Sequence, residues 1–579
     1  MNETARQQAQ QYLEQEKAFR LGELTTESFH PKTMDLGRTS RQDLPAAVRM
    51  LQSVDRDIPP VAQRVLQSVQ WRRLRSALLE AMRSGRKIFF TGCGATGRLS
   101  ILLEAAWRRF WQQRKPSTPP AVANREDIVF SVMAGGDFAL IRSVEGFEDF
   151  QGFGRRQLRD LGVGGGDVVV AITEGGETSF VIGAAWEGLD AEASVFFVYN
   201  NPTDLLRQQV QRSREIIDEP RITRLDLATG PMAVTGSTRM QATTIELLVV
   251  AAALESALVE YLGPAATRAG AESLLPQDYA NRFVRLLDQV EADANVQTMA
   301  RLIELERDLY ARKGLVTYLA DEVMLDVLTD TTERSPTFMI PPFRAADDSL
   351  SPRSWAFVKN PHASTVEAWA QMLRRNPRGL TWTRPVFESI GAPEKIVASP
   401  PQLDNSRIHQ FRIGNELDAS RTQAPDSALI AIVAGPQDSA LLPFLKAEGY
   451  RAWPRALVLA FGQAAIGPQD FSIACDLPTG PLELWRHLAV KLVLNTVSTI
   501  TMAALGRIEG NAMTWVSPSN KKLIDRGTRL IALQTGCDYD SACYALFEAI
   551  HEIQQRAGRH EEVPSPVAVA IQQLKSKPS

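Results

Sequence analysis

The 579-residue sequence has few of the residues on which disulfide-bonded and metal-binding proteins depend. It contains four cysteines and six histidines, and neither a Cys-x-x-Cys pair nor a His-x-x-x-His spacing occurs. These absences exclude a disulfide framework and argue against a zinc site or another bound metal. The cysteines are therefore expected to be reduced thiols.

Net charge and long apolar runs are scarce as well. The formal net charge is −3, so neither a nucleic acid nor an anionic membrane is indicated as a partner. No segment reaches 18 uninterrupted apolar residues, and the N-terminal residues are polar, without the apolar region of a signal peptide. A cytoplasmic location is therefore expected. A hydrophobic content of 44% is ordinary for a globular protein, and the length requires two or three domains.

What the sequence does contain is a glycine-rich turn. Residues 92–98 read Gly-Cys-Gly-Ala-Thr-Gly-Arg, after an apolar run at 88–90 and before a helix-like stretch at 99–110. A strand that turns through glycines into a helix presents backbone N–H groups and the positive end of the helix dipole to a ligand. The turn is therefore predicted to bind a phosphate group.

The same spacing matches the dinucleotide fingerprint Gly-x-Gly-x-x-Gly, which leaves a nucleotide cofactor as the alternative. That fingerprint needs an acidic residue about 20 positions further on. Residues 116–120 read Pro-Ser-Thr-Pro-Pro at that distance, which is a loop. The Thr96 hydroxyl also suits a terminal phosphomonoester better than a buried pyrophosphate. No cofactor is expected.

Short β-branched or aromatic runs alternate with helical segments in two successive sets. The strand candidates are 88–91, 128–132, 168–173 and 195–199 in the first set, and 315–319, 356–358, 429–434 and 457–461 in the second. Such alternation predicts two α/β units, each with a parallel sheet covered by helices on both faces. Their similar size suggests an internal duplication.

The second unit lacks the glycine turn. Residues 320–322 read Ala-Asp-Glu after its first strand, and acidic side chains at that point would repel a phosphate. Only the first unit is therefore expected to keep a phosphate site. The expected organisation is a helical N-terminal segment over 1–75, a first domain over 76–265, a second domain over 280–505 and a helical cap over 506–579.

Further candidate ligand groups follow the third strand of the first unit. Residues 173–179 read Thr-Glu-Gly-Gly-Glu-Thr-Ser, and ligands of open parallel sheets lie at the carboxyl ends of the strands. The hydroxyls of Thr173 and Thr178 and the nearby N–H groups are the candidate donors. The alternative is a solvent-exposed loop that caps a helix.

Two other segments of this unit carry suitable groups. Glu145 and Glu148 lie on one face if their segment is helical, and carboxylates near a sugar can hold hydroxyls or move protons. A solvated acidic helix face is the alternative. Ser237 and Thr238 open a long helix, where a hydroxyl can cap the helix and bind a phosphate at once.

Several motifs in register resemble the sugar isomerase (SIS) domain family that holds the N-acetylmuramic acid 6-phosphate etherases and the glucokinase regulatory proteins. They are Glu-Ser-Phe-His-Pro at 27–31, the glycine turn with Leu99, Ala-Gly-Gly at 134–136, Glu-Gly-Phe-Glu-Asp at 145–149, Gly-Ser-Thr-Arg-Met at 236–240, Lys-Leu-Val-Leu-Asn at 491–495, Gly-Asn at 510–511 and Asn-Lys-Lys-Leu-Ile-Asp-Arg at 520–526. The resemblance covers nearly the whole chain and is weakest between 340 and 480.

This resemblance implies two tandem flavodoxin-like SIS domains that pack as a pseudo-dimer with a helical cap, as in the regulatory proteins. It also implies a sugar 6-phosphate ligand, of the fructose 6-phosphate or N-acetylmuramic acid 6-phosphate class. The implied ligand-binding residues are Gly94, Thr96, Gly97, Thr173, Gly175, Thr178, Glu145, Glu148, Ser237, Thr238 and Lys491. Lys491 resembles a lysine that reaches the bound phosphate.

The chain also departs from the etherase pattern. The position of the catalytic glutamate on the first helix holds Ala106, and Glu104 lies about 160° away around a helix. The second catalytic carboxylate persists as Glu148. The stretch 330–338 of the second unit resembles the segment that carries the missing glutamate and offers Glu333.

Two further departures, Gly175 in place of a serine and Gln241 in place of a lysine, weaken the expected phosphate affinity. The favoured interpretation is a phosphosugar-binding protein of the regulatory type, which senses a sugar 6-phosphate and controls a partner such as a sugar kinase. The alternative is a diverged etherase, a carbon–oxygen lyase whose catalytic residues Glu148 and Glu333 come from different units.

Overall fold

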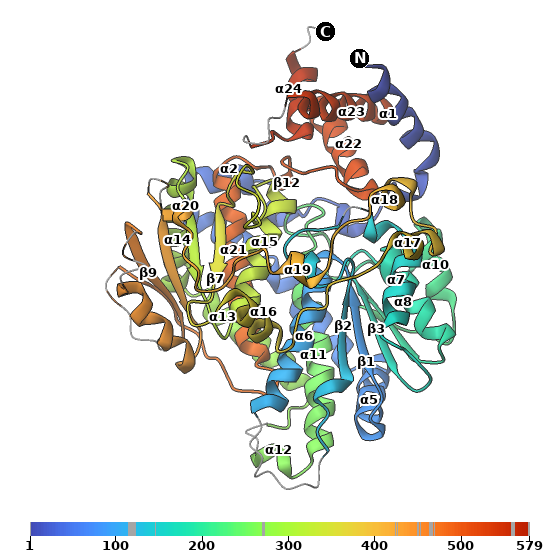
Figure 1. Cartoon of the computed structure of the whole chain (residues 1–579), viewed down its shortest axis with the longest axis vertical. Coiled ribbons are helices and arrows are strands. Elements are labelled where there is room, and N and C mark those ends of the chain that lie inside the picture. Colours follow the sequence, from blue (N-terminus) through green and yellow to red (C-terminus); the bar gives the residue numbers. More distant parts are fainter. Residues whose placement is uncertain are drawn as a thin grey trace.

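The computed structural model describes residues 2–113, 123–144, 146–268, 272–422, 424, 426–447, 451, 453–462, 467, 469–556 and 562–576 (Figure 1). Two five-stranded parallel sheets lie side by side, one built from each half of the chain. They are the two α/β units that the alternating pattern predicts.

The first sheet follows the strand order β2-β1-β3-β4-β5, with every pair of neighbours parallel. Its strands are β1 (Ile88–Gly92), β2 (Val129–Met133), β3 (Val168–Thr173), β4 (Ser194–Tyr199) and β5 (Thr223–Asp226). The order reverses between β1 and β3, as in flavodoxin-like folds, whose ligands bind at that point.

The second sheet repeats the same order. Its sequence of neighbours is β10-β9-β8-β6-β7, again all parallel, so its strands occupy the places of the first five in turn. They are β6 (Val316–Leu319), β7 (Ala356–Lys359), β8 (Ala428–Val433), β9 (Arg455–Phe461) and β10 (Phe471–Ile473). The repeated topology confirms the predicted tandem α/β architecture.

One hydrophobic core joins the two units. Long helices lie between the sheets, and their buried apolar side chains pack with residues of both sheets in one continuous cluster. The helices at this interface are α6 (Gly94–Gln113), α11 (Gln241–Leu262), α15 (Met324–Phe338) and α21 (Leu484–Ala504). By length and composition α11 and α21 are apolar enough to span a membrane, but 94% and 83% of their apolar windows are buried inside this core.

The remaining helices pack around this common core, cover the outer faces of the sheets or form the sequence ends. The first half of the chain forms α1 (Glu3–Gln15), α2 (Leu36–Gln42), α3 (Leu44–Gln52), α4 (Ile58–Leu66), α5 (Val69–Ser84), α7 (Gln151–Asp160), α8 (Ser179–Asp190), α9 (Thr203–Gln209), α10 (Gln211–Asp218) and α12 (Ala265–Arg268). The second half forms α13 (Pro276–Val290), α14 (Asp293–Ala311), α16 (Thr365–Leu373), α17 (Arg384–Ser389), α18 (Glu394–Ala398), α19 (Asn405–Ile408) and α20 (Ala419–Thr422).

The C-terminal helices form a cap over the carboxyl ends of the first sheet. After the short hairpin β11 (Ile508–Glu509) and β12 (Ala512–Met513), the chain forms α22 (Lys521–Thr535), α23 (Tyr539–Arg556) and α24 (Pro566–Ser576). The N-terminal helix α1 packs against α23, so both ends of the chain meet in the cap (Figure 1). The helical cap that the sequence predicts is therefore completed by the N-terminal segment.

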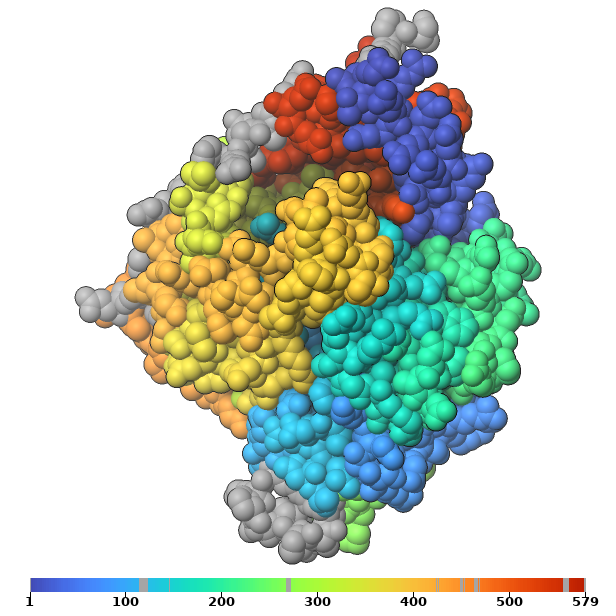
Figure 2. Space-filling view, turned by 45° about the vertical axis from the view of Figure 1, so that its right-hand side comes forward, coloured from blue at the N-terminus to red at the C-terminus, as the bar shows by residue number. Residues whose placement is uncertain are grey.

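The second unit also reaches over the outer face of the first. Figure 2 shows the gold segment that holds α17 and α18 lying against the cyan helices of the first unit. Phe387 and Leu403 of this segment are buried in the outer core of the first unit, beside Phe147 and Phe153. This contact brings a part of the second half of the chain close to Glu148.

Candidate functional site between the two units

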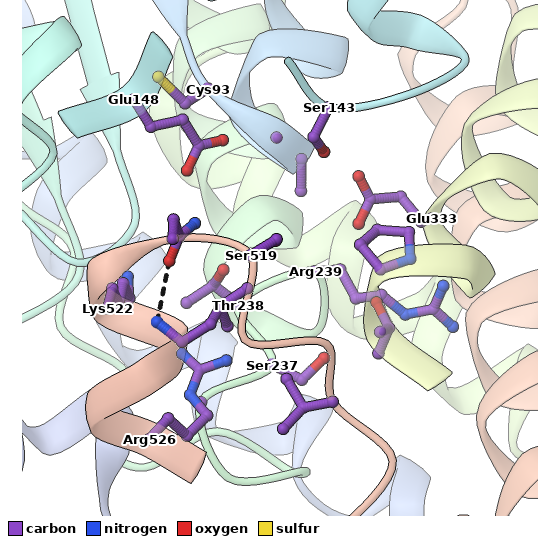
Figure 3. A pocket seen from close by; sticks show the side chains of 18 of the residues that line it. Cys93, Ser143, Glu148, Ser237, Thr238, Arg239, Glu333, Ser519, Lys522 and Arg526 are labelled. Carbon is purple, nitrogen blue, oxygen red and sulfur yellow. Dashed lines mark hydrogen bonds between the residues drawn. The ribbon is translucent and has the colours of Figure 1, made fainter. Parts of the chain in front are cut away.

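A cavity of about 370 Å³ lies at the carboxyl ends of the first sheet, between the two units and beneath the cap. That volume is in the usual range for small-molecule sites. Figure 3 shows side chains of the lining residues pointing toward a common space. The walls are formed by residues 93–95, 143, 144, 146, 148, 174, 178, 236–239, 333, 336, 337, 513, 516, 519, 520, 522, 523 and 526. Residues from both units and from the cap thus form one site.

The glycine turn forms one wall of the cavity. Cys93, Gly94 and Ala95 line it where β1 passes into α6. A Cβ on Gly92 would lie 2.5 Å from the carbonyl carbon of Thr96, so the tight turn requires glycine there. The first N–H groups of α6 and the positive end of its dipole lie at this wall, which favours an anionic ligand group.

Thr96 and Gly97 have structural roles within this turn. The Thr96 hydroxyl is fully buried, accepts a hydrogen bond from the Cys93 N–H (3.1 Å) and donates one to the Cys93 carbonyl (2.8 Å). Gly97 lets α6 approach β2, because a Cβ there would lie 2.5 Å from Met133 Cγ. Neither residue lines the cavity, and direct contact of Thr96 and Gly97 with a ligand stays a prediction.

The loop after β3 presents different groups from those the sequence suggests. Thr178 lines the cavity, whereas Thr173 does not, and their hydroxyls lie 3.0 Å apart. Gly175 is also absent from the cavity wall, and a Cβ there would lie 2.9 Å from a Glu177 carboxylate oxygen. Glu174, which the sequence reasoning did not single out, lines the cavity instead.

The turn before α11 and the cap supply hydroxyl groups and positive charge. Ser237, Thr238 and Arg239 line the cavity from the turn, and Lys522 and Arg526 line it from α22 (Figure 3). Gly236 has a φ of +72°, and a Cβ there would lie 2.4 Å from Arg526 Nε, so glycine allows the turn to contact α22.

The two cap cations that line the cavity, Lys522 and Arg526, each have a carboxylate partner. Lys522 lies 2.7 Å from Glu177, which also pairs with Arg212 at 2.9 Å. Arg526 pairs with the buried Glu27 at 2.6 Å. The motifs at 27–31 and 520–526 therefore meet in space. In the sequence these two motifs serve only to support the family resemblance, although the lysine and arginine of 520–526 also indicate an anion site.

Lys491 lies elsewhere. Its ammonium group donates to the Arg239 carbonyl (2.9 Å) and to the Thr244 hydroxyl (2.8 Å), and it lines a separate small cavity of about 60 Å³. Burial lowers its pKa to about 7. Lys522 is the lysine that lines the main cavity, and a contact between Lys491 and a bound phosphate stays a prediction.

Two carboxylates from different units face each other across the cavity (Figure 3). Glu148 belongs to the short turn Phe147–Asp149, and burial raises its pKa to about 7. Glu333 comes from α15 of the second unit and forms an ion pair of 2.5 Å with Arg98 of α6. Glu148 is thus buried where a negative charge is unfavourable, whereas Glu333 forms an ion pair with an arginine.

A third carboxylate adds to the negative charge. Burial raises the pKa of Glu174 to about 7, although a hydrogen bond with the Thr238 hydroxyl opposes the shift. A protonated Glu174 would donate a hydrogen bond to a phosphate oxygen, whereas its ionised form would repel the phosphate.

Among its described residues, helix α6 has no carboxylate that lines the cavity. Glu104 is buried among arginines, and although burial opposes the shift, Arg375 and Arg378 lower its pKa to about 2. Ala106 is buried in the common core. Glu145, the other predicted sugar-side carboxylate, lies outside the described residues.

Comparisons with known proteins agree with the geometry. The family model of the "Glucokinase regulatory protein N-terminal SIS domain" matches residues 72–187. N-acetylmuramic acid 6-phosphate etherase of Yersinia pestis (strain Pestoides F) is 30% identical over 230 residues, which are 40% of this chain and 69% of that protein.

Solved structures with a similar arrangement include tagatose-6-phosphate ketose/aldose isomerase from Escherichia coli, with 11% identity over 81% of this chain and 94% of that chain. The C-terminal domain of glucosamine-fructose-6-phosphate aminotransferase from Francisella tularensis has 9% identity over 78% and 96%. The TM-score is 0.41 in both cases.

Proposed function

The chain belongs to the SIS-domain family of the N-acetylmuramic acid 6-phosphate etherases and the glucokinase regulatory protein, and we propose that it is a carbon–oxygen lyase of the etherase type. Its substrate would be a sugar 6-phosphate with an ether-linked acid, of the N-acetylmuramic acid 6-phosphate class, and its product D-lactate. We also propose a cytoplasmic location.

The observation that carries this proposal is the convergence of Glu148 and Glu333 on one cavity. Elimination of an ether needs one group to take a proton from carbon and another to protonate the leaving oxygen. Two carboxylates in unlike surroundings can divide these roles, because one can hold a proton while the other is ionised. Burial raises the pKa of Glu148 and so favours its protonated form, whereas Glu333 forms an ion pair with Arg98.

The apparent loss of a catalytic glutamate from α6 is consistent with this proposal. In a pair of units related by a pseudo-twofold axis, the residue on α15 that serves the first unit corresponds to the residue on α6 that would serve the second. Glu333 takes the first role, and Ala106 stands in the second. A single complete site therefore needs only one of the two glutamates.

In the second unit, charged side chains of the protein occupy the place that corresponds to the glycine turn. Glu322 follows β6, where the first unit has its glycine turn, and forms ion pairs with Arg109 of α6 and with Arg374. Both arginines that contact Glu322 are therefore already paired, and the part of the chain that the structure describes shows no other cation in an ion pair with Glu322. We therefore propose that the protein has one active site, in the first unit.

The phosphate of the substrate would bind where N–H groups, hydroxyls and a cation meet. The N-terminus of α6, Thr178, Ser237, Thr238 and Lys522 line this part of the cavity. Because Lys522 already pairs with Glu177, a phosphate would compete with that carboxylate or share the ammonium group with it.

Lactate release from N-acetylmuramic acid 6-phosphate tests the proposal. The purified full chain should release D-lactate at about 1 s⁻¹ or faster, and Glu333→Gln should lower the rate of release by about 10²–10⁴-fold while the substrate still binds. Glu304→Gln, at an exposed carboxylate of α14, is the matched control and should behave like the wild type. Tight binding without release by the wild type would contradict the lyase proposal.

The second candidate function is regulation of a sugar kinase by a bound phosphosugar such as fructose 6-phosphate. The observation that favours it is the match of residues 72–187 to the regulatory family model, together with two units in one chain. Binding of fructose 6-phosphate without lactate release, and a change in the rate of a sugar kinase on addition of the chain, would support this function over the first.

A further inference from the structure

A second cavity of about 350 Å³ adjoins the site and is nearly as large as the first. Ser143, Pro336 and Ser519 line both cavities, so the two cavities are adjacent. Figure 2 shows a hollow on this side of the molecule, between the yellow-green residues near 345 and the red C-terminal residues. We call this second cavity the side groove.

The side groove carries an excess of positive charge. Arg142 lines it and forms no ion pair with any residue that the structure describes. Arg344 donates only to uncharged oxygens, the carbonyls of Ser349 and Ser351 and the Ser420 hydroxyl. The groove therefore offers two guanidinium groups without a carboxylate within ion-pair distance.

The carboxylate in the groove wall is already engaged. Glu562 accepts a hydrogen bond from Trp355 Nε1 (2.6 Å) and lies 3.7 Å from Arg507. Arg98, which also lines the groove, is held by Glu333. Asp348, outside the groove wall, interacts electrostatically with both Arg142 and Arg344 but forms no ion pair with either among the described residues. One carboxylate against two guanidinium groups leaves an excess of positive charge, so the groove favours an anion.

The floor of the groove is apolar and rigid. It is formed where α15 ends at Met339, whose φ of +50° turns the chain into the run Ile340, Pro341 and Pro342. Arg507 fixes this turn by donating to the Phe338 carbonyl at 2.6 Å and to the Met339 carbonyl at 3.0 Å. A preformed apolar floor beside two cations suits an extended chain that ends in an anionic group.

The helix α15 connects the groove to the proposed chemistry. Glu333 faces the main cavity, whereas Thr332 and Ser335 line the groove, and Pro336 lines both. A substituent that leaves the sugar at the bond beside Glu333 would therefore pass Pro336 into the groove. This position makes the groove a continuation of the site on the side of the leaving group.

We propose that the side groove is a subsite for an acyl arm longer than lactyl, linked through the ether oxygen of the sugar and ending in a carboxylate that Arg142 and Arg344 bind. The assignment rests on the proposed function, because that function defines which side of the sugar carries the ether. It predicts that the preferred substrate is larger than a monosaccharide phosphate with a simple lactyl group.

Binding of matched synthetic ligands tests this assignment. The three ligands are N-acetylmuramic acid 6-phosphate, its amide with glycylglycine, which ends in a carboxylate, and the methylamide of that dipeptide arm, which ends without charge. Calorimetry would use the full chain with Glu333→Gln to prevent turnover. The carboxylate-ended arm should bind about 10-fold more tightly than the uncharged arm.

Variants of the groove then locate the effect. Arg142→Ala should remove most of this preference and leave the affinity for the unextended ligand unchanged, whereas Arg142→Lys should retain part of it. Arg407→Ala is the control, because this nearby arginine pairs with Asp347 and does not line the groove.

Equal affinity for the two dipeptide arms, or an undiminished preference in Arg142→Ala, would overturn the subsite. Failure of the proposed function has a different signature, since the wild type would then release neither lactate nor the lactoyl dipeptide from any of the three ligands, whatever their affinities.

Discussion

The two units of this protein have one topology and opposite site chemistry. In the first unit, β1 ends in a glycine turn whose helix, α6, points its N-terminus into the cavity. In the second, β6 is followed by Glu322, which is neutralised by Arg109 and Arg374. The helices that follow these strands show the opposite difference. Helix α15 of the second unit carries Glu333, whereas α6 of the first unit carries Ala106 at the corresponding position.

This difference teaches how a duplicated fold can keep one site. The glycine turn of the first unit and Glu333 of the second line one cavity between the units, whereas Ala106 lies in the common core and Glu322 belongs to an ion-pair network. The Arg98–Glu333 pair lies at this junction, with both side chains largely buried, so it holds the two halves of the site in register. Each unit contributes what the other lacks.

Of the substitutions proposed here, Glu333→Gln should have the largest effect on lactate release. Loss of one proton-transferring carboxylate typically costs 10²–10⁴-fold in rate, so kcat for lactate release should fall by about that factor, while calorimetric affinity changes by less than about 10-fold. Exchange of the sugar's C2 hydrogen in deuterium oxide would tell which step Glu333 serves. Unchanged lactate release would remove Glu333 from the site.

Ala106→Glu is the reciprocal change. A glutamate at 106 would be buried in the common core without a cation beside it, because the described arginines nearest along α6, Arg108 and Arg109, are already paired. We expect a loss of about 3–5 kcal/mol in unfolding free energy and no increase in lactate release. Denaturant unfolding measures the first, with Ala106→Gln as the size-matched uncharged control. A faster variant would mean that α6 faces a working site.

Glu174→Gln should sharpen the contrast in charge between the units. Burial raises the pKa of Glu174 to about 7, above its ordinary value of 4.5. The protonated group therefore contributes stability at low pH, and this contribution is lost as the pH rises through about 7. The variant should lack that decline between pH 5 and pH 8 in thermal unfolding.

The same variant should bind a sugar phosphate about 10-fold more tightly at pH 8, with a smaller gain at pH 6, where wild-type Glu174 is protonated. Glu215→Gln, at an exposed carboxylate of α10, is the control for both measurements. A pH-independent difference in affinity would show that the charge of Glu174 does not face the ligand.

The smallest effects on binding should separate two threonines of the first unit. Thr96→Val removes the hydrogen bonds to Cys93 and should reduce the free energy of unfolding by about 1–3 kcal/mol, with little change in sugar-phosphate affinity. Thr178→Val should do the reverse, because Thr178 lines the cavity. A larger loss of affinity in Thr96→Val than in Thr178→Val would return Thr96 to the binding surface.

The sequence alone determined the architecture. Buried parallel strands read as short β-branched or aromatic runs, so the first four strands of each sheet were predictable from residues such as 168–173 and 429–434. The fifth strands, β5 and β10, were not predicted, because one is partly exposed and the other has three residues, which leaves little periodicity to detect. The glycine turn was predictable too, since its backbone conformation depends on local sequence.

The tertiary structure decided which side chains share the cavity. The sequence indicates the segments that line the cavity, but it does not show that Thr96 turns inward while Glu174 lines the cavity, because these side-chain directions depend on packing. The sequence favours Lys491 as the phosphate lysine, whereas the fold of the cap brings Lys522 to the cavity wall.

Glu148 and Glu333 show the same limit most clearly. Each was a candidate from its own motif, yet their common cavity depends on how the two units pack through α6 and α15. Local sequence fixes strands, helices and turns because these depend on near neighbours. Contacts between residues far apart in the chain depend on the burial of a whole core, and only the folded molecule records that outcome.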